Sequence, residues 1–249
     1  MLVEGLEPLP PGALESLSQA STASVTSELF KLGIRHSFMA GVTPLDPTRT
    51  MIGQAVTVRY VPAREDLDTF ESLADPEHPQ RRAVETIGSG EVLVLDARGD
   101  LRAAVLGEIL VARLLARGAA GFVTDGAVRD AAGIRALGLP AYVRGASAAA
   151  NVTVHHAADM NQVIGCGGIM VCPGDVLFGD ADGVVVIPRH LVSRVAATAA
   201  NRDRLEDYIL GRIRAGESLR GVYPPNEQVL RDYEAMSGPD SSRSTPAPR

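Results

Sequence analysis

The stretch GEILVARLLARGAAGFVTDGAVRD, residues 107–130, predicts a helix, a strand and a second helix in direct succession. Apolar residues at helical spacing predict the first helix over 108–117, and Gly118 stands where a glycine commonly ends a helix. The apolar run 121–124 predicts a short buried strand, followed by a turn at Asp-Gly and a new helix over 130–137. Strands that alternate with helices in this way indicate an α/β domain.

Three kinds of group in this stretch suit the binding of a small oxo-acid on a divalent cation. The first amides of the helix, from Glu108 to Leu110, have no intrahelical partner and attract an anion. Arg129 carries a permanent charge and can hold a carboxylate through two parallel hydrogen bonds. Asp130 is a hard oxygen ligand for Mg²⁺ or Mn²⁺, and Mg²⁺ needs only one or two protein carboxylates. The alternative is that Arg129 and Asp130 form a solvated surface pair, and the residues alone leave both interpretations open.

Further elements are expected on both sides of this stretch. Helices are expected over 22–33, 83–87 and from 190 to 208 or beyond, and strands over 51–60, 91–96, 141–144, 152–155, 168–171, 176–178 and 183–187. The last two strands are joined by Gly-Asp-Ala-Asp-Gly and form a predicted hairpin. Residues 62–80 are charged and contain proline, so an exposed excursion is expected there. Residues 237–249 have the composition of a disordered tail.

Composition argues against several classes of protein. With 249 residues, of which 45% are hydrophobic, the chain can build one sizeable domain or two small ones. A net charge of −6 argues against non-specific nucleic-acid binding, and no apolar run reaches the ~20 residues of a membrane-spanning helix. The first residues lack the pattern of a signal peptide, so a cytoplasmic protein is expected. Cys166 and Cys172 are expected to be reduced thiols rather than a disulfide or a zinc site.

The sequence resembles the family that contains the regulator of ribonuclease activity A and the class II 4-hydroxy-4-methyl-2-oxoglutarate aldolases, some of whose members carry the older label demethylmenaquinone methyltransferase. Besides the stretch 107–130, the resemblance rests on TASVTSELFKLGI (22–34), MAGVTPL (39–45), IGQAVTVRYVPARED (52–66), GEVLVLDARGD (90–100) and CPGDVLFGDADGVVVIP (172–188). It covers most of residues 20–225.

This resemblance implies a fold and an assembly. The implied fold is a three-layer β/β/α arrangement of the swivelling-domain type, an α/β domain over residues 21–225 with helical extensions at both ends. Residues 1–20 would form an N-terminal arm, and residues 226–249 a C-terminal segment with the disordered tail. The family also implies a homo-oligomer, either a trimer or a hexamer built from two trimers.

The resemblance further assigns roles to the central stretch. In the aldolases of this family, the amides at the Gly-acid-x-Leu position and the following Arg bind the pyruvyl carboxylate, and the next Asp binds the metal. Carried over, the substrate-binding residues are Gly107, Glu108, Ile109, Leu110 and Arg129, the catalytic residues are Arg129 and Glu108, and the ligand of Mg²⁺ or Mn²⁺ is Asp130. Glu108 would hold a catalytic water. Asp is expected at that position in the aldolases, so the longer side chain here alters where the water lies.

Other polar residues have both a functional and a structural interpretation. The family implies an acid from a neighbouring subunit near the metal, for which Asp203 and Glu206 are candidates. The Gly-Asp-rich loops could hold a metal, but turn chemistry is favoured because Asx side chains bond to their own backbone; these residues are Asp175, Asp180 and Asp182. The adjacent His155 and His156 would face opposite sides of a strand, so one could reach the site and donate a proton, but polar residues at a strand edge are the favoured interpretation.

Two classes of function follow. The first is a divalent-metal-dependent lyase that cleaves a 4-hydroxy-2-oxo acid to release pyruvate. Decarboxylation of oxaloacetate would be a side activity, because both reactions form the same enolate. Lys31 is the only lysine in the sequence, which argues against a Schiff-base mechanism. The second class is a non-catalytic regulator that binds a ribonuclease or another protein. Glu108, Arg129 and Asp130 favour the enzyme.

Overall fold

The computed structural model of the protein describes residues 9–237. At its centre the long strand β2 (Met51–Pro62) runs parallel to β3 (Glu91–Asp96), and β5 (Gly121–Val128) and β6 (Ala141–Ala146) continue the parallel set. Nearly every residue of β3 and β5 is buried. Runs of this kind, apolar on both faces, are typical of parallel strands that are covered on both sides.

Antiparallel strands extend the central set at both ends. The sheet has the order β1-β6-β5-β3-β2-β10-β11, while β4 pairs with β5, β7 pairs with β2, and β8 and β9 form a separate hairpin. The bounds of these strands are Thr43–Pro44 (β1), Ala104–Leu106 (β4), His155–Met160 (β7), Ile164–Cys166 (β8), Ile169–Val171 (β9), Val176–Gly179 (β10) and Val184–Ile187 (β11). The hairpin predicted from the Gly-Asp-rich loop is confirmed, because β10 and β11 pair in antiparallel register.

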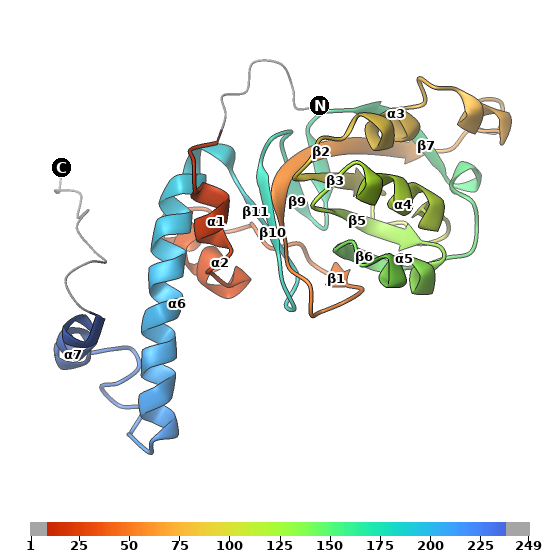
Figure 1. Ribbon diagram of the computed structural model, residues 1–249. Coiled ribbons are helices and arrows are strands. Elements are labelled where there is room, and N and C mark those ends of the chain that lie inside the picture. Colours follow the sequence, from red (N-terminus) through yellow and green to blue (C-terminus); the bar gives the residue numbers. More distant parts are fainter. Residues whose placement is uncertain (1–8, 238–249) are drawn as a thin grey trace.

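The helices form two groups on opposite sides of the strands (Figure 1). Their bounds are Ala13–Leu17 (α1), Thr22–Lys31 (α2), Pro79–Thr86 (α3), Glu108–Ala116 (α4), Ala131–Leu137 (α5), Val192–Arg214 (α6) and Glu227–Ser237 (α7), with short 3₁₀ turns at Glu71–Ala74, Asn151–Thr153 and Arg189–Leu191. One core joins α3, α4 and α5 to the parallel strands, and a second joins those strands to the two hairpins. A third core packs α1, α2 and α6 on β10 and β11. The predicted α/β fold is therefore confirmed, with a helical layer, a central sheet, a second β layer and terminal helices.

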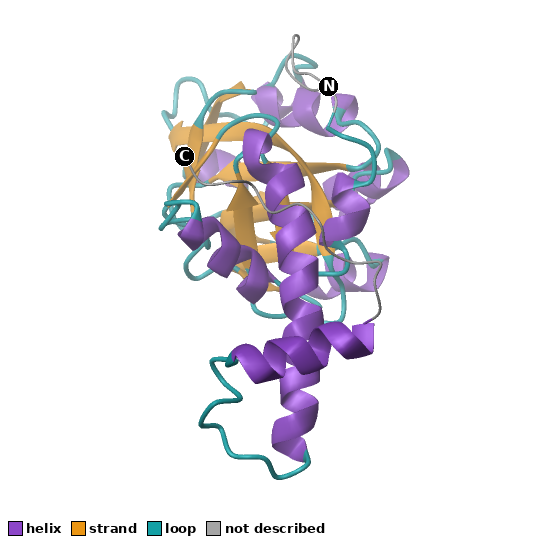
Figure 2. Ribbon diagram, turned by 90° about the vertical axis from the view of Figure 1, so that its left-hand side faces the viewer, coloured by secondary structure: helices purple, strands orange, loops and turns teal. Residues whose placement is uncertain are grey.

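The long helix α6 has two halves with different surroundings. Its first half is buried in the chain's own core through Val192, Val195, Ala196 and Ala199. The apolar segment 192–200 is therefore covered by α1, α2 and the β10–β11 hairpin of the same chain. The second half extends beyond the sheet and packs on α7, as Figure 2 shows. The sequence did not indicate α7, and residues 238–249 of the predicted tail lie outside the described residues.

The predicted turn at Asp125 and Gly126 is wrong. Strand β5 continues through both residues to Val128, with an irregular register against β6 between Thr124 and Ala127. The reason is that Asp125 is buried and accepts hydrogen bonds from the amides of the loop after β3, so the strand has no need to turn there. An Asp-Gly pair can thus satisfy distant backbone instead of forming a local turn.

A second expected element also differs. The strand predicted over 152–155 is instead a 3₁₀ turn at Asn151–Thr153, and β7 begins only at His155. The amides of Thr153 and Val154 bond back to the carbonyls of Ala150 and Asn151, which curls the backbone before the strand starts. No helix within residues 9–237 combines the length and the apolar character that a membrane crossing requires.

Candidate functional site

The predicted site lies where the end of β5 meets the start of α4. The amide of Arg129 donates to the carbonyl of Leu106 over 3.0 Å, which fastens these two chain segments together. A Cβ atom placed on Gly107 would lie 2.9 Å from Nε of Arg129 and 3.1 Å from Oδ2 of Asp130. Both side chains therefore lie directly against the backbone of Gly107, and a larger residue there would push them from this position. The structure brings these three predicted residues together.

The start of α4 is open to an anion. Gly107 is the N-cap residue in an extended conformation, and no side chain caps the helix. The first intrahelical bond runs from the amide of Val111 to the carbonyl of Gly107 over 3.2 Å. The amides of Glu108, Ile109 and Leu110 precede that bond, so they are the unsatisfied donors of the helix. At the other end, the amides of Gly118 and Ala119 bond back to α4 in a Schellman motif, as the predicted terminal glycine requires.

The carboxylate of Asp130 does not cap the helix α5, which begins directly after it. Asp130 is the N-cap of α5 in a left-handed conformation, φ 59° and ψ 35°, so α5 begins one residue later than predicted. Its carbonyl accepts from Ile134, but its carboxylate makes no cap bond. The nearest charge is Nε of Arg129, 3.5 Å from Oδ2, and both side chains are about half exposed, at 48% and 50%. Asp130 thus presents carboxylate oxygens to solvent beside a cation.

The side chain of Glu108, at the start of α4, extends to α5. Its carboxylate lies against Gly133, where a Cβ atom would overlap both carboxylate oxygens. Gly133 is an interior position of α5, where a glycine weakens a helix relative to alanine. This glycine therefore leaves the space that the Glu108 side chain occupies, next to the helix that Asp130 begins.

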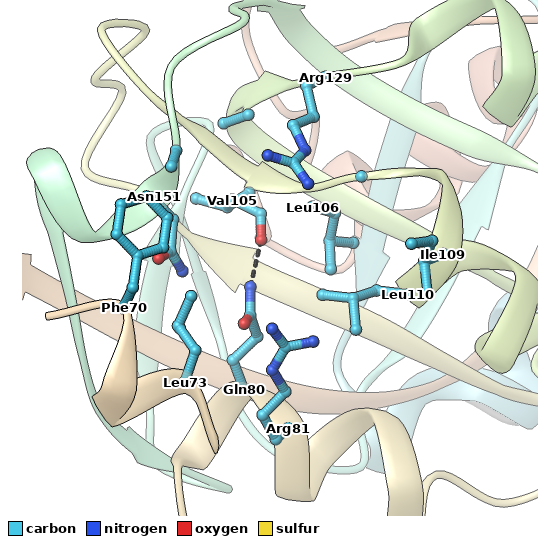
Figure 3. Close-up of a pocket in the computed structure, with 13 residues that line it drawn as sticks. Phe70, Leu73, Gln80, Arg81, Val105, Leu106, Ile109, Leu110, Arg129 and Asn151 are labelled. Atoms are coloured by element: carbon cyan, nitrogen blue, oxygen red, sulfur yellow. Dashed lines mark hydrogen bonds between the residues drawn. The ribbon is translucent and has the colours of Figure 1, made fainter. Parts of the chain in front are cut away.

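A cavity of about 240 Å³ opens on one side of Arg129. Its walls are mostly apolar and come from the segment before α3, from β4 and from the first turn of α4, including Phe70, Leu106 and Leu110. Figure 3 shows Arg129 pointing into this cavity from one end. A second hollow of about 420 Å³ is lined by Val128, Arg129, Asp130 and residues 146–148. Arg129 therefore lies between the two spaces, and Asp130 borders only the second.

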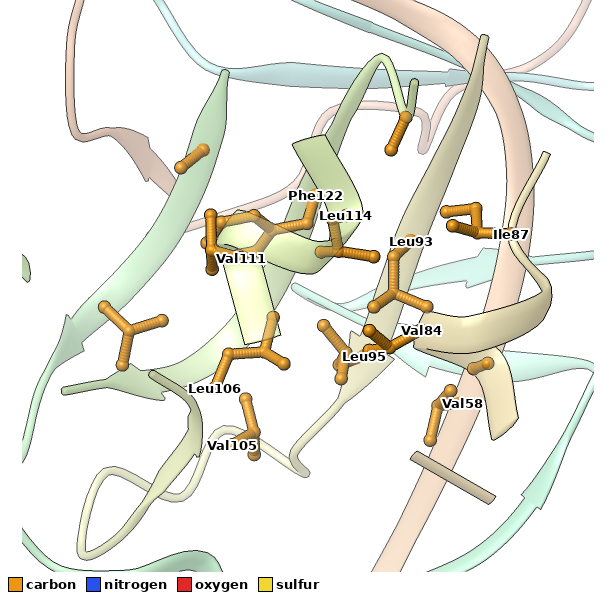
Figure 4. Packing of buried hydrophobic residues seen from close by; sticks show 14 of the residues in the cluster. Val58, Val84, Ile87, Leu93, Leu95, Val105, Leu106, Val111, Leu114 and Phe122 are labelled. Carbon is orange, nitrogen blue, oxygen red and sulfur yellow. The ribbon is translucent and has the colours of Figure 1, made fainter. Parts of the chain in front are cut away.

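The site rests on a rigid base. Val111 and Leu114 of α4 pack on Phe122 of β5 and on Leu95 of β3 in the same buried cluster (Figure 4). Leu106, at the edge of the cavity, belongs to this cluster as well. Groups that project from the ends of well-packed elements are held more accurately than groups on loops. The arrangement of Gly107, Arg129 and Asp130 is therefore built into the fold.

One wall of the cavity was not predicted from the sequence. Residues 62–79 are exposed or half-buried, as predicted, but Phe70 and Leu73 of this excursion also line the cavity, and the next helix supplies Gln80 and Arg81. The only local signal was a pair of arginines after Pro79, the first residue of α3. Nothing in that pattern indicated which of the two arginines would face the cavity.

The other acidic candidates have structural partners. Asp203 accepts from the amide of Ser21 over 2.5 Å and so holds the start of α2, while Glu206 pairs with Arg202 over 2.9 Å. In the Gly-Asp-rich loops, the carboxylate of Asp180 accepts from the amides of Thr22 and Asp182, and that of Asp175 from the amides of Cys172 and Arg189. These bonds confirm a structural role for Asp175 and Asp180, and the bond from the amide of Asp182 to Asp180 is the expected local turn. Within the described part of the chain, no three or more His, Cys, Asp or Glu side chains gather as a metal cluster.

The two adjacent histidines contact other groups of the chain and do not line the cavity, and neither cysteine lines it. His155 is buried, its Nε2 lies 3.1 Å from the carbonyl oxygen of Ala103, and burial lowers the pKa of its imidazole. Nδ1 of His156 lies 2.8 Å from Oδ1 of Asp68. Neither histidine lines the cavity, so neither is placed there to donate a proton. Both cysteines are free thiols, as expected.

Comparison with known proteins settles the family. The model of the RraA-like family, described as Aldolase/RraA, matches residues 22–186. The chain belongs to the RraA-like family. A protein of Halalkalibacterium halodurans, named provisionally as a 4-hydroxy-4-methyl-2-oxoglutarate aldolase, is 34% identical over 161 residues, which are 65% of this chain and 70% of that protein.

Solved structures of RraA-like proteins share the fold. RraAS2 of Streptomyces coelicolor, described as an unusual member of the RNase ES inhibitor RraA protein family, is 30% identical, with a TM-score of 0.75 over 83% of this chain and 100% of that one. An uncharacterized protein of Pseudomonas syringae pv. tomato is 25% identical, with a TM-score of 0.76 over 88% and 100%. The RraA-like family thus includes both proteins named as aldolases and proteins named as ribonuclease inhibitors.

Proposed function

We propose that this RraA-like protein is a divalent-metal-dependent lyase that cleaves 4-hydroxy-2-oxo acids and releases pyruvate. One observation carries the proposal: a free helix start, an arginine and an uncapped aspartate all meet at Gly107, between two hollows. The identity to a protein named as an aldolase supports it. A solvated surface pair would not need a glycine to make room for it, nor would it border a cavity.

The substrate carboxylate would bind to Arg129 and the start of α4. The guanidinium can form two parallel bonds to a carboxylate, and the amides of Ile109 and Leu110 add neutral donors at the positive end of the helix dipole. Arg129 has only the exposed Asp130 as an ion-pair partner within residues 9–237, at 3.5 Å. It is therefore available for a ligand.

Asp130 fits a hard divalent cation. Its carboxylate has no cap bond, is half exposed and borders a hollow with room for water molecules. A single protein carboxylate suffices for Mg²⁺, which retains several waters. When bound, Mg²⁺ or Mn²⁺ would supply Lewis-acid stabilisation of charge that develops on the 2-oxo oxygen.

The chain's own residues account for the proton transfers. In the cleavage, the 4-hydroxyl loses its proton, the C3–C4 bond breaks, and C4 becomes the carbonyl of the departing fragment. The electron pair of that bond passes to the pyruvyl half, and a proton added at C3 completes pyruvate. Glu108 would hold the water that carries these protons, as the family resemblance implies; its carboxylate lies against Gly133 of α5, next to the helix that Asp130 begins. Loss of CO₂ from oxaloacetate leaves the same pyruvyl half, so that decarboxylation is proposed as a side activity.

A Schiff-base route has no residue to carry it. Lys31, the only lysine, lies on α2 with its Nζ 2.6 Å from Oε1 of Glu28. Helix α2 packs with α6 on the outer side of the β10–β11 hairpin, whereas α4 lies on the other side of the sheet (Figure 1). The chain's only side-chain amine is therefore remote from the proposed site.

The proposal is tested by pyruvate release. The protein should release pyruvate from 4-hydroxy-4-methyl-2-oxoglutarate in the presence of Mg²⁺ or Mn²⁺. Exhaustive chelation should abolish the activity, and added metal should restore it. Full activity after chelation would refute the metal dependence. No release from any 4-hydroxy-2-oxo acid would instead favour the second candidate, a protein that binds a ribonuclease or another partner, which the likeness to RraAS2 supports.

We also propose that the chain forms a homo-oligomer, either a trimer or a hexamer. Large apolar side chains at the rim of the cavity are exposed, with Ile109 at 81% and Phe70 at 69%. A neighbouring subunit that covers them would be placed to supply an acid near Asp130. Sedimentation at micromolar concentration should show a species of three or six chains. A monomer would contradict this proposal and any site that is shared between subunits.

A further inference from the structure

The cavity beside Arg129 holds a second arginine at its opposite end. Arg81 comes from the first turn of α3, and Figure 3 shows its guanidinium directed toward Arg129 across the space. Arg81 is well placed because its neighbour Gln80 is buried and donates from Nε2 to the carbonyl of Val105 on β4. That bond ties the start of α3 to the floor of the cavity.

The charge of Arg81 is not paired with an acid in the part of the chain that the structure describes. Its Nε is buried without a hydrogen-bond partner, and no carboxylate in residues 9–237 forms an ion pair with it. The residues that line the cavity include two arginines and no acid. Buried cations in proteins are normally paired, so a partly buried guanidinium that faces a cavity without an acid is suited to an anion from outside the chain.

The space between the two arginines is apolar and small. Phe70, Leu73, Leu106 and Leu110 form its sides. A volume of about 240 Å³ is below the roughly 300–1,000 Å³ of pockets for drug-sized ligands. The cavity therefore suits a short carbon chain with an anionic group at each end, and not a nucleotide or a larger cofactor.

We infer that the guanidinium of Arg81 is the group that binds the distal carboxylate of the substrate. The inference rests on the proposed function, because it uses Arg129 as the contact for the pyruvyl carboxylate. Arg81 then acts as a specificity residue at the end of the substrate remote from Arg129. The apolar sides of the cavity accommodate the carbons between the two carboxylates.

Binding of two matched ligands that cannot be cleaved tests this assignment. 2-Oxoglutarate and 2-oxopentanoate share a chain length and differ only in a distal carboxylate or methyl group. Calorimetry with Mg²⁺ should show that the wild-type protein binds 2-oxoglutarate more tightly by about 10- to 100-fold, which corresponds to one or two factors of 1.4 kcal/mol. Arg81→Gln should lose this preference and keep its affinity for 2-oxopentanoate within about threefold.

Arg82→Gln is the matched control. Arg82 lies on the same helix and carries the same charge, but it is exposed and pairs with Glu77 over 3.5 Å. This variant should keep the wild-type preference. Equal binding of both ligands by the wild type, a preference that survives in Arg81→Gln, or no binding of either ligand would overturn the inference. Because no turnover is needed, a protein that shows the preference but releases no pyruvate would refute the lyase and leave the Arg81 subsite standing.

Discussion

Asp125 and Asp130 lie close together in sequence, within and just after β5, yet their surroundings are opposite. Asp125 is 5% exposed and accepts from the amides of Ala97, Gly99 and Gly167 over 2.8, 3.0 and 3.4 Å. Burial raises the pKa of its carboxyl group against the lowering effect of those bonds. The Asp130 side chain is 50% exposed and caps nothing. A carboxylate that accepts hydrogen bonds from backbone amides stabilises the fold. A carboxylate without such bonds is available to a ligand.

The same contrast separates other charged residues. Asp175 and Asp180 are engaged by backbone amides, as Asp125 is. Arg82 pairs with Glu77, while its neighbour Arg81 faces the cavity without an acid. If this distinction is correct, substitutions at the free groups should change ligand binding and turnover, and substitutions at the engaged groups should change stability.

The largest effect is expected at Arg129. Removal of one partner of a desolvated charge pair costs about 2–5 kcal/mol, so Arg129→Ala or Arg129→Lys should lower kcat/KM about 30- to several-thousand-fold. Lysine cannot replace the two parallel bonds of the guanidinium. Oxalate, which resembles the planar enolate of pyruvate, should inhibit the wild type and lose affinity for both variants. Arg135→Lys, on the exposed side of α5, serves as the control. A change below about threefold at Arg129 would return it to the class of solvated surface residues.

The next effect is on stability. Asp125→Ala leaves buried amides without an acceptor, and each such loss costs about 1–3 kcal/mol. We expect urea unfolding to show a total loss of at least about 2 kcal/mol, while Asp130→Asn should stay within about 0.5 kcal/mol of the wild type. If both substitutions destabilise the protein equally, the contrast between the engaged and the free carboxylate fails.

Gly133→Ala separates function from stability in one variant. The added methyl group would overlap the Glu108 carboxylate and displace it. Displacement of a group by about 1 Å can cost about 100-fold in rate, so turnover should fall roughly 10- to 100-fold. The substitution should leave the free energy of unfolding unchanged or raise it by up to about 1 kcal/mol, because alanine favours a helix. Gly211→Ala on α6, where nothing lies within 4 Å of the new Cβ, is the control and should keep full activity.

The smallest effect concerns His78. Its imidazole has a lowered pKa, first because of burial and then because of the positive charge of Arg81, with a smaller lowering from His156; Asp68 and Asp75 oppose the shift. Arg81→Gln should therefore raise the pKa of His78, whereas Arg82→Gln should leave it unchanged. An NMR titration of the histidine ring protons measures both. An unchanged pKa in Arg81→Gln would place that guanidinium away from His78 and weaken its assignment to the cavity.

Much of the fold was predictable because its signals are local. The stripe of α4, the terminal Gly118 and the buried run of β3 each follow from the spacing of apolar residues and from glycine at a left-handed position. The Asp125 turn was mispredicted because its hydrogen-bond partners lie about thirty residues away in sequence, in the loop after β3. No local pattern distinguishes an Asp-Gly turn from a buried acceptor of that kind.

The candidate site shows the same division. Gly107, Arg129 and Asp130 were predicted together because a helix start and a strand end come in one continuous stretch. Arg81 and Phe70 were missed because they reach the cavity from a charged segment whose composition predicts only exposure. Whether a charged side chain is free or engaged depends on tertiary contacts, and that property distinguishes the residues that we propose as functional.

Metal binding at Asp130 tests the central claim most directly. Electron paramagnetic resonance of Mn²⁺, titrated into the wild-type protein, into Asp130→Asn and into Asp182→Asn, measures bound metal without any assay of turnover. Asp182 is an exposed aspartate of the Gly-Asp-rich loop and serves as the matched control. We predict that the wild type and Asp182→Asn bind Mn²⁺ alike and that Asp130→Asn loses the bound signal while remaining folded. Equal binding by all three proteins would contradict the assignment of Asp130 as the metal ligand.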